Sequence, residues 1–199
     1  IGKMGLVLSD DYDIEYYKGS VKLTGAPKNV GSDYKIRYIG KGNYTGMVER
    51  SFSITSDAGI LTLVVEGSAT VTYNTQNRIP QLTVKDNVNN TLNIYDADHP
   101  NGYTVRYYDS TGTETSVMRN AGVYTIEAVG HGNYAGKKGT ATYIIQPKSI
   151  ADDDVILSDI TDQQYNGVAH TPEIAMEYMD ETLAAGTDYA AYYSSNVYA

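Results

Sequence analysis

Two segments of the chain alternate hydrophobic and polar side chains with the period of a β-strand. In residues 33–39 (DYKIRYI), Tyr34, Ile36 and Tyr38 alternate with charged residues, and residues 11–17 (DYDIEYY) alternate in the same way. Because successive side chains of a strand point to opposite faces, each segment predicts a strand with one apolar and one polar face. Further strands are predicted at 60–65, 69–73, 82–84, 141–145 and 155–157, with turn residues between them.

One segment has the composition of a helix. Residues 173–185 (EIAMEYMDETLAA) contain good helix formers, but the internal alignment described next places them over the extended-looking residues 81–93 (QLTVKDNVNNTLN). We therefore predict strand and turn for residues 173–185. The whole chain then belongs to the all-β class.

A motif of thirteen residues occurs twice, ninety residues apart. YKIRYIGKGNYTG begins at Tyr34, YTIEAVGHGNYAG begins at Tyr124, and seven of the thirteen positions are identical. Other motifs recur with a similar spacing: YNTQNRIP at 73–80 with YNGVAHTP at 165–172, and DYDIEYY with GYTVRYY at 102–108 and, more loosely, DYAAYY at 188–193. A fixed period of this kind indicates an array of small structural units.

The order of these motifs predicts three units. Residues 56–147 form a complete repeat, residues 1–55 the back part of an earlier one, and residues 148–199 the front part of a later one. Within each unit we favour an Ig-like β-sandwich. The alternative is a β-grasp-like sheet that carries one short helix.

The repeated motif places glycines at a chain reversal. The predicted turn residues are Gly40, Gly42, Asn43, Tyr44 and Gly46 in the first copy, and Gly130, Gly132, Asn133, Tyr134 and Gly136 in the second. The glycines can adopt positive φ without a Cβ penalty, and Asn tolerates the left-handed region better than most residues. We expect each Tyr ring to cover the open end of its core, with the hydroxyl near water or a carbonyl. Tyr134→Ala is therefore predicted to cost about 3 kcal/mol.

Composition supports the all-β prediction and excludes several functions. The 199 residues include 20 Tyr, one Phe, no Trp and 19 Gly, a bias toward strands and turns. A net charge of -9 repels a phosphate backbone, so nucleic acid is not an expected partner. The absence of Cys excludes disulfides, thiol nucleophiles and Cys-based zinc sites. No apolar run is long enough to predict membrane insertion in this segment.

The turn and strand motifs resemble a known repeat class. Tyr165-Asn166-Gly167, the Asp-Tyr strand at Asp188 and the two Gly-Asn-Tyr-x-Gly turns resemble the Tyr-x-Gly class of MBG-type repeats, close to the bacterial Ig-like modules of large surface proteins and adhesins. This resemblance implies an extracellular or cell-surface stalk, spacer or adhesive module. Its expected partners are neighbouring repeats of the same chain and a host or cell-surface glycan or protein.

Residues suited to catalysis are few. The chain has three His (His99, His131 and His170), no Gly-x-Ser-x-Gly elbow and no phosphate-binding glycine motif. We predict no catalytic residue, no cofactor and a non-enzymatic module, with His131 a solvated turn residue. The acidic runs at 96–99 (DADH) and 152–154 (DDD) carry oxygen ligands but lack the spacing of an EF-hand, so we predict solvated loops and no metal site.

Tyr17 and Tyr108 occupy matching positions on the polar sides of their strands. Such a pair can stack on a sugar ring or a protein partner. The other interpretation, which we favour, is packing against a neighbouring strand or unit. The third copy has Ser194 at this position. The pair leaves open a second function, a carbohydrate-binding module of a larger secreted protein.

Overall fold

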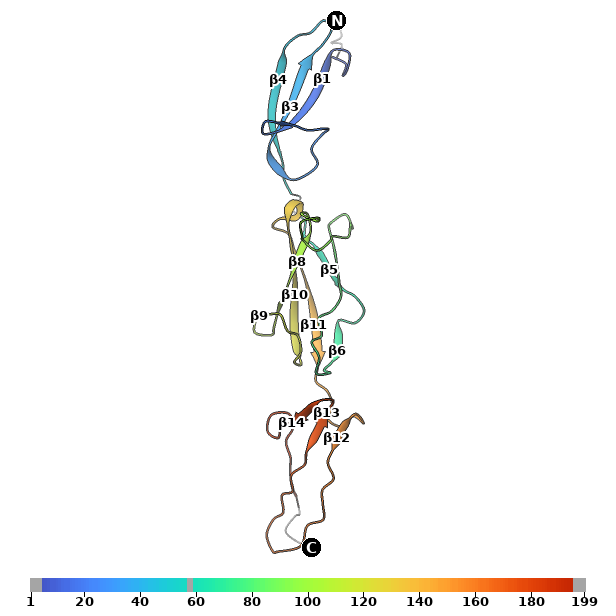
Figure 1. Ribbon diagram of the computed structural model, residues 1–199, viewed down its shortest axis with the longest axis vertical. Helices are drawn as coiled ribbons and strands as arrows, with labels where there is room; N and C mark the ends of the chain where they lie inside the picture. Colours follow the sequence, from blue (N-terminus) through green and yellow to red (C-terminus); the bar gives the residue numbers. More distant parts are fainter. Residues whose placement is uncertain (1–4, 57–58, 195–199) are drawn as a thin grey trace. The chain divides into compact units, whose positions relative to one another are not determined.

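The computed structural model describes residues 5–56 and 59–194, which form β-strands, turns and one short 3₁₀ segment (Figure 1). The strands are β1 (Tyr12–Lys18), β2 (Val21–Lys22), β3 (Gly31–Gly40), β4 (Met47–Ile54), β5 (Thr62–Val65), β6 (Thr70–Thr72), β7 (Leu82–Lys85), β8 (Tyr103–Tyr108), β9 (Glu114–Thr115), β10 (Gly122–Gly130), β11 (Lys138–Gln146), β12 (Val155–Leu157), β13 (Met176–Tyr178) and β14 (Glu181–Leu183), and the 3₁₀ segment is η1 (Gly132–Tyr134). The predicted all-β class is confirmed. The Ig-like sandwich remains a prediction.

The strands form four sheets. Their strand orders are β2-β1-β3-β4, β6-β11-β10-β8-β9, β12-β13-β14 and β5-β7. The contacts divide the chain into two compact units: unit 1 contains residues 1–63, 83–105 and 127–140, and unit 2 contains residues 64–82, 106–126 and 141–199. The repeat boundaries after residues 55 and 147 come from the sequence pattern and remain a prediction. Each unit is described by itself below.

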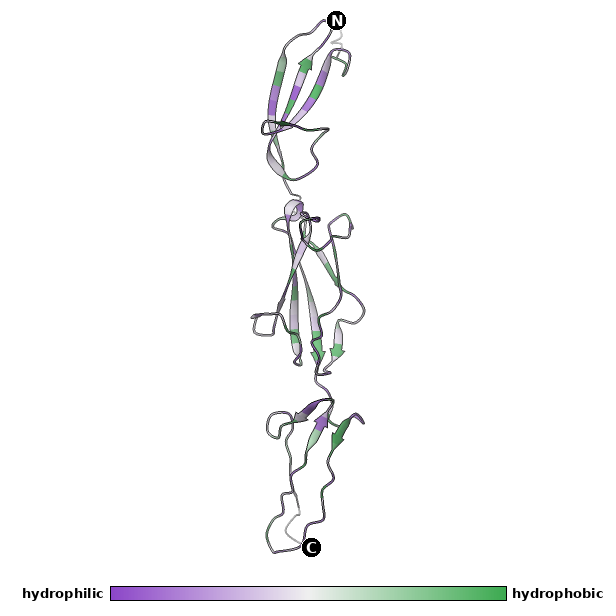
Figure 2. Cartoon of the chain, in the orientation of Figure 1, coloured by the Kyte–Doolittle hydropathy of each residue, from purple (hydrophilic) through white to green (hydrophobic). Residues whose placement is uncertain are grey.

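The first sheet of unit 1 has the two different faces that the alternation predicts. Ile14 lies opposite Tyr38 in the antiparallel β1–β3 pair, and Tyr38 lies opposite Val48 in the antiparallel β3–β4 pair. Residues directly opposite each other share a face. We call this side, with Tyr12, Ile14, Ile36, Tyr38 and Val48, the apolar face. Figure 2 shows the alternating hydrophobic and hydrophilic positions along β1, β3 and β4.

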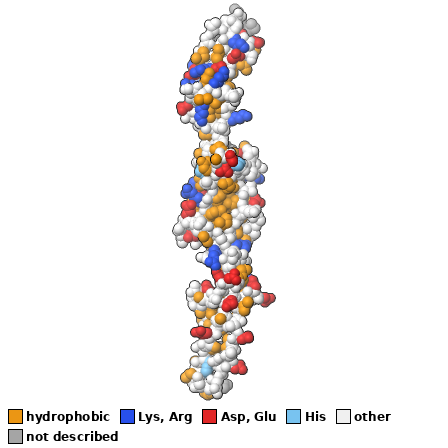
Figure 3. Space-filling model, in the orientation of Figure 1, with side chains coloured by type: hydrophobic (Ala, Val, Ile, Leu, Met, Phe, Trp, Pro, Cys, Tyr) orange, Lys and Arg blue, Asp and Glu red, His pale blue; other side chains and the backbone are white. Residues whose placement is uncertain are grey.

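The opposite face of this sheet carries charged pairs. Glu49 of β4 accepts from Arg37 Nε (2.7 Å) and Lys35 Nζ (3.2 Å) of β3. The part of the molecule that contains the N-terminus shows basic and acidic side chains between hydrophobic ones (Figure 3). These ion pairs are partly exposed, so each contributes little to stability. These charged side chains allow this face of the sheet to remain in contact with water.

The remainder of unit 1 has a closed apolar core. The side chains of Leu61, Val84, Leu92, Tyr103 and Ala128 are all at least nine-tenths buried. Leu61 of the segment before β5 donates its backbone N–H to the Lys138 carbonyl at the start of β11 (3.0 Å). Burial of several large apolar side chains is the main favourable contribution to the folding of such a unit.

Unit 2 contains a parallel strand pair and a three-stranded antiparallel sheet. β6 pairs in parallel with β11, and β12, β13 and β14 pair antiparallel, with Met176 of β13 opposite both Leu157 and Leu183. Its core contains fully buried Met118, Ile126 and Ile145, together with Tyr124, Tyr143, Val155, Met176 and Tyr178. This unit also contains a polar network around Tyr73, which is described in the next section.

The strand predictions hold, with one exception. Residues 173–185 form β13, a turn and β14, as predicted from the internal alignment. The strand predicted at Asp188 is wrong. Asp188 lies in a turn, where its carboxylate accepts from the backbone N–H of Ala184 (2.8 Å), and Tyr189 forms only an isolated bridge with Ala185. A short Asp side chain that accepts from a nearby N–H favours a turn over an extended strand.

Among the described residues, no helix is long and apolar enough to cross a membrane.

Candidate functional site

The two Gly-Asn-Tyr turns have the same backbone conformation at their paired glycines. Gly42 and Gly46 have φ angles of +60° and +92°, and Gly132 and Gly136 have φ angles of +58° and +83°. Only glycine adopts this region without strain from a Cβ atom. The positive φ that the sequence predicted is therefore confirmed for these four glycines.

The glycine that precedes each pair has a different role. Gly40 and Gly130 have no positive φ, but an added Cβ would lie 3.0 Å from the Thr45 backbone nitrogen in the first turn and 2.3 Å from the Tyr134 carbonyl oxygen in the second. These glycines are needed because the backbone folds closely over them. Sequence reasoning assigned them to positive φ, and that assignment is wrong.

The Asn of each turn also differs from the expectation. Neither Asn43 nor Asn133 adopts the left-handed region. Asn133 acts through its side chain instead: its Oδ1 accepts from the Val30 N–H (2.8 Å), and its Nδ2 donates to Asn29 Oδ1 (3.0 Å). The Asn133 backbone N–H donates to Asn101 Oδ1 (2.9 Å). Within unit 1, Asn133 thus ties the turn after β10 to the loop before β3.

A tyrosine closes the start of both long hairpins in the same way. The hydroxyl of Tyr34 donates to the Asn29 carbonyl (3.0 Å), and that of Tyr124 donates to the Asn120 carbonyl (2.8 Å). The first copy has one more residue here, and a register shift between Gly31 and Tyr34 accommodates it. A β-bulge of this type adds one residue to one strand of a pair and bends that strand locally.

The two turn tyrosines are packed to different extents. Tyr134 is half-buried, and its hydroxyl donates to Asp86 Oδ2 (3.2 Å), whereas Tyr44 is 46 % exposed. The expectation that both rings cover a core is therefore wrong for Tyr44. Tyr134 is held by the loop of residues 86–90, and residues 5–54 contain no equivalent of that loop. Burial and the adjacent Asp86 carboxylate both raise the pKa of Tyr134.

Asp86 organises the loop that meets Tyr134. It is 6 % exposed, and its carboxylate accepts from the Val88 N–H (3.0 Å), the Asn90 N–H (2.8 Å) and Asn90 Nδ2 (2.9 Å). Burial raises the pKa of Asp86, but the hydrogen bonds from Asn90, Val88 and Tyr134 outweigh that effect, so the pKa is lowered overall. The sequence did not single out Asp86, because nothing in its spacing separates it from other loop acids.

The side chain of Tyr17 contacts two other residues of its own sheet. The Arg37 guanidinium lies 4.0 Å from the centre of the Tyr17 ring, and the Tyr17 hydroxyl donates to Glu15 Oε2 (2.7 Å). Tyr108 is half-buried in β8, opposite Glu114. The face of the ring that carries the guanidinium is not open to a sugar. The geometry of Tyr17 therefore favours the packing interpretation.

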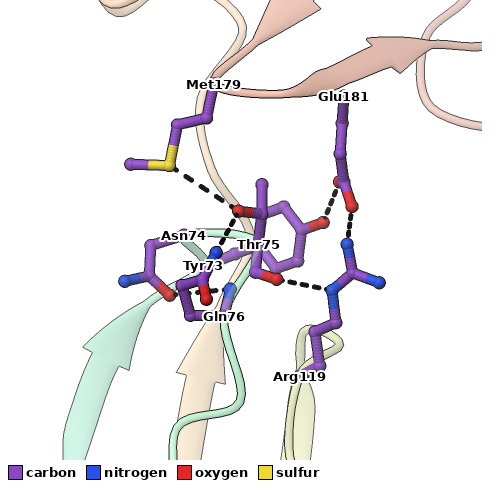
Figure 4. Close-up of polar contacts among 7 residues, drawn as sticks. All are labelled: Tyr73, Asn74, Thr75, Gln76, Arg119, Met179 and Glu181. Carbon is purple, nitrogen blue, oxygen red and sulfur yellow. Dashed lines mark hydrogen bonds and ion pairs between the residues drawn. The ribbon is translucent and has the colours of Figure 1, made fainter.

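A polar network of side chains in unit 2 surrounds Tyr73 (Figure 4). The Tyr73 hydroxyl donates to one carboxylate oxygen of Glu181, and Arg119 forms an ion pair with the other. Arg119 Nε also donates to the Thr75 carbonyl (2.6 Å). The Tyr178 hydroxyl donates to the Tyr73 carbonyl (3.3 Å), and the rings of Tyr73 and Tyr178 lie 6.3 Å apart. These residues, which we call the Tyr73 junction, tie β13 and β14 to the segments after β6 and before β10.

The backbone of the junction is also specialised. Thr75 is 6 % exposed and has a φ of +64°, and its hydroxyl contacts the sulfur of Met179, which has a φ of +53°. Non-glycine residues adopt positive φ only where the surrounding structure compensates. In the third repeat, Gly167 stands where Thr75 stands in the complete one, and Gly167 also has positive φ, at +79°. The backbone at this position thus has a positive φ with either residue.

Lys148 completes the junction from the chain segment before β12. Its ammonium pairs with Asp152 (2.8 Å) and Asp154 (2.6 Å) and lies 5.2 Å from the centre of the Tyr178 ring. The hydrogen bonds to Asp152 and Asp154 raise the pKa of Lys148. The acidic run at 152–154 therefore serves as the partner of a lysine. A cavity of about 450 Å³ lies beside these groups, lined by Tyr73, Asn120, Lys148, Tyr178, Glu181 and Asp188.

The remaining sequence candidates have local roles. Asp96 Oδ1 accepts from the His99 N–H (2.7 Å) and lies 2.9 Å from His99 Nδ1, as in a self-contained turn. His131 stacks on Tyr95 with ring centres 4.2 Å apart, and its Nε2 lies 3.0 Å from Thr104 Oγ1, so the prediction of a solvated side chain is wrong. Within residues 5–56 and 59–194, no group of three or more His, Cys, Asp or Glu side chains is arranged to hold a metal ion.

Comparison with known proteins adds no relative: no family model, no curated protein and no solved structure matches this chain. The interpretation of function therefore depends on the geometry just described.

Proposed function

We propose that this chain is a non-enzymatic structural segment of a bacterial surface protein, made of repeated β units and serving as a stalk or spacer. The observation that carries the proposal is the recurrence of one hairpin at Tyr34 and Tyr124. Both copies share the positive-φ glycines, the close approach at the preceding glycine and the Tyr hydroxyl bonded to an Asn carbonyl. Agreement at this level of detail supports duplication of one structural repeat. The details that recur all serve the fold, which supports a structural role.

A second observation concerns the loop that precedes each repeated hairpin. In unit 1, Asn29 and Val30 bind the Asn133 side chain. In unit 2, Arg119 binds Glu181. The alignment places both loops at the same position in the repeat. A contact that recurs at one position of the repeat supports coupling between successive repeats, which a spacer needs.

Force spectroscopy on the chain, held by its two ends, tests the proposal. A repeat of about 90 residues that resists force should unfold in one step and release about 300 Å of extended chain. Extension without discrete peaks would contradict a spacer that stays folded under tension. The measurement needs no partner and no assumption about location.

A glycan array separates the spacer from a carbohydrate-binding module. The spacer proposal expects no specific signal. Specific binding that is lost in Tyr108→Ala and retained in Tyr17→Ala would favour the carbohydrate-binding module, since the Tyr17 ring is already covered by Arg37.

A further inference from the structure

Some tyrosine hydroxyls of this chain donate a hydrogen bond to a carboxylate. They include those of Tyr17 to Glu15 (2.7 Å), of Tyr134 to Asp86 (3.2 Å) and of Tyr73 to Glu181. A neutral phenol loses an electron readily only if its proton leaves at the same time, and a carboxylate within hydrogen-bond distance can accept that proton. These tyrosines are therefore candidates for one-electron oxidation.

A cation near the ring opposes oxidation at two of these tyrosines. The Arg37 guanidinium lies 4.0 Å from the centre of the Tyr17 ring, and the Lys137 ammonium lies 5.6 Å from the centre of the Tyr134 ring. Removing an electron from such a ring is unfavourable, because the attraction between the cation and the ring electrons is lost. Of the three tyrosines, Tyr73 is the one favoured for oxidation.

The Tyr73 junction holds the proton acceptor in place (Figure 4). Arg119 forms an ion pair with one carboxylate oxygen of Glu181, and the other oxygen accepts from the Tyr73 hydroxyl. The charged pair fixes the orientation of the carboxylate. The Tyr73 side chain is half-buried, so an oxidant can approach part of its ring while the hydroxyl stays on Glu181.

A second tyrosine lies beside Tyr73. The ring centres of Tyr73 and Tyr178 are 6.3 Å apart, with an angle of 40° between the rings, and the Tyr178 hydroxyl donates to the Tyr73 carbonyl (3.3 Å). The Lys148 ammonium lies 5.2 Å from the centre of the Tyr178 ring, but its two carboxylate partners offset its charge. Tyr178 is 6 % exposed, so we expect it to lose its electron to the oxidised Tyr73 ring, after which Tyr73 is oxidised again.

We propose that Tyr73 and Tyr178 form a site of oxidative cross-linking, where a one-electron oxidant such as the haem of a peroxidase joins the two rings as dityrosine. Each phenol loses one electron to the oxidant and one proton. Glu181 accepts the proton of Tyr73, and water accepts the proton of Tyr178.

The coupling of the two phenoxyl radicals completes the link. Side-chain motion brings the ring edges together, and a carbon–carbon bond forms between the positions next to the hydroxyls. The hydrogen on each of these carbons then moves through water to the phenoxyl oxygen. The chain loses two hydrogen atoms in all, and one hydrogen peroxide is reduced to two waters.

A link at this place acts on stability as a disulfide does. It joins residues that are 105 positions apart, which lowers the entropy of the unfolded chain. The chain contains no Cys, so a disulfide cannot provide such a link. The link follows from the contacts around Tyr73 and does not depend on the spacer function.

Photochemical oxidation of the 199-residue chain tests the site. The oxidant is a ruthenium tris-bipyridyl complex with persulfate as the final electron acceptor, at a low protein concentration where links between chains are rare. After proteolytic digestion, mass spectrometry should find a linked pair of peptides that contains Tyr73 and Tyr178 and has lost two hydrogen atoms. Tyr178→Phe should abolish this product.

Glu181→Gln tests the proton acceptor. The amide oxygen can still accept from the Tyr73 hydroxyl, but it is a far weaker base, so the yield of the link should fall by about tenfold or more. Glu177→Gln, at an exposed position of β13, is the matched control and should keep the yield of the wild type. Far-UV circular dichroism and thermal melts confirm that both variants are folded.

The pair of Tyr12 and Tyr38 is the internal reference for proximity. Their ring centres lie 5.8 Å apart, and no hydrogen bond from either hydroxyl to a carboxylate is seen among the residues that the structure describes. Coupling governed by distance alone would favour this pair. The proposal is overturned if the wild-type chain gives no link between Tyr73 and Tyr178, if Glu181→Gln gives as much of it as the wild type, or if the link between Tyr12 and Tyr38 is the more abundant one.

Discussion

At the scale of single residues, the same side chain acts differently in the two copies of the turn. Tyr44 and Tyr134 share their neighbours in sequence, yet only Tyr134 meets a partner, the buried carboxylate of Asp86. The sequence motif specifies the backbone of the turn, and the loop of residues 86–90 decides whether the ring is buried. Packing of a motif residue depends on segments that the motif does not contain.

This difference predicts unequal costs of truncation. Tyr134→Ala should destabilise the chain by about 2 kcal/mol, somewhat less than full burial of an aromatic would give, because the ring is half-buried. Tyr44→Ala, at a 46 % exposed ring, should cost less than about 1 kcal/mol. Urea titrations of both variants measure the difference. Equal losses would show that the Asp86 loop does not hold the Tyr134 ring.

Asp86 predicts a dependence of stability on pH. Its pKa is lowered in the folded chain, so its ionisation stabilises the native state at pH above the unfolded value of about 3.9, and this contribution is lost as the pH falls through the folded value. Asp86→Asn removes it. The wild type should therefore lose more stability than the variant between about pH 5 and about pH 3. Urea titrations at these pH values check this, and parallel losses would contradict the role of Asp86.

At the scale of elements, the alternation of hydrophobic and polar residues predicted most strands, but it did not predict the turn at Asp188. Residues 33–39 and 11–17 became β3 and β1 because their apolar positions need one common face. The strand predicted at Asp188 failed because a single carboxylate–backbone bond, to Ala184, stabilises a turn there. Hydrophobic pattern reports which face is buried, but it contains no information about one local hydrogen bond.

Two of the turn glycines predict different costs of substitution by Ala, because the new Cβ clashes at one position and meets no atom at the other. Gly132→Ala should be strongly destabilising, by about 2 kcal/mol or more, because φ is +58° and the new Cβ would lie 2.3 Å from Asn101 Oδ1. Gly136→Ala has a similar φ, +83°, with no atom within 4 Å of the Cβ, so it should cost only about 1 kcal/mol. Thermal melts of the two variants compare them directly. A larger loss in Gly136→Ala would mean that backbone strain outweighs the clash.

At the scale of the whole molecule, the sequence predicted the repeated parts better than the contacts between them. Tyr73 and Thr75 were recognised as repeat positions, but Arg119, Lys148 and Glu181 carried no periodic signal. Charged residues in loops are usually solvated, and their partners lie far away in sequence: Glu181 bonds to Tyr73, 108 residues earlier. Such pairs depend on the tertiary fold. An alternating pattern within one strand cannot reveal them.

The Tyr73 junction predicts that residues 155–183 are stabilised by residues outside their own sheet. β12, β13 and β14 are each three residues long, and so short a sheet is not expected to be stable alone. Glu181→Ala removes the carboxylate that binds both Tyr73 and Arg119, and it should cost about 1 kcal/mol, as expected for a partly exposed charged hydrogen bond. Amide hydrogen exchange should then become faster in β12–β14 and remain unchanged in β3 and β4, since local opening depends on local contacts. Glu177→Ala, at an exposed position of β13, is the matched control. If both variants exchange alike, the sheet is held by the apolar contacts of Val155, Met176 and Tyr178 and not by the polar network.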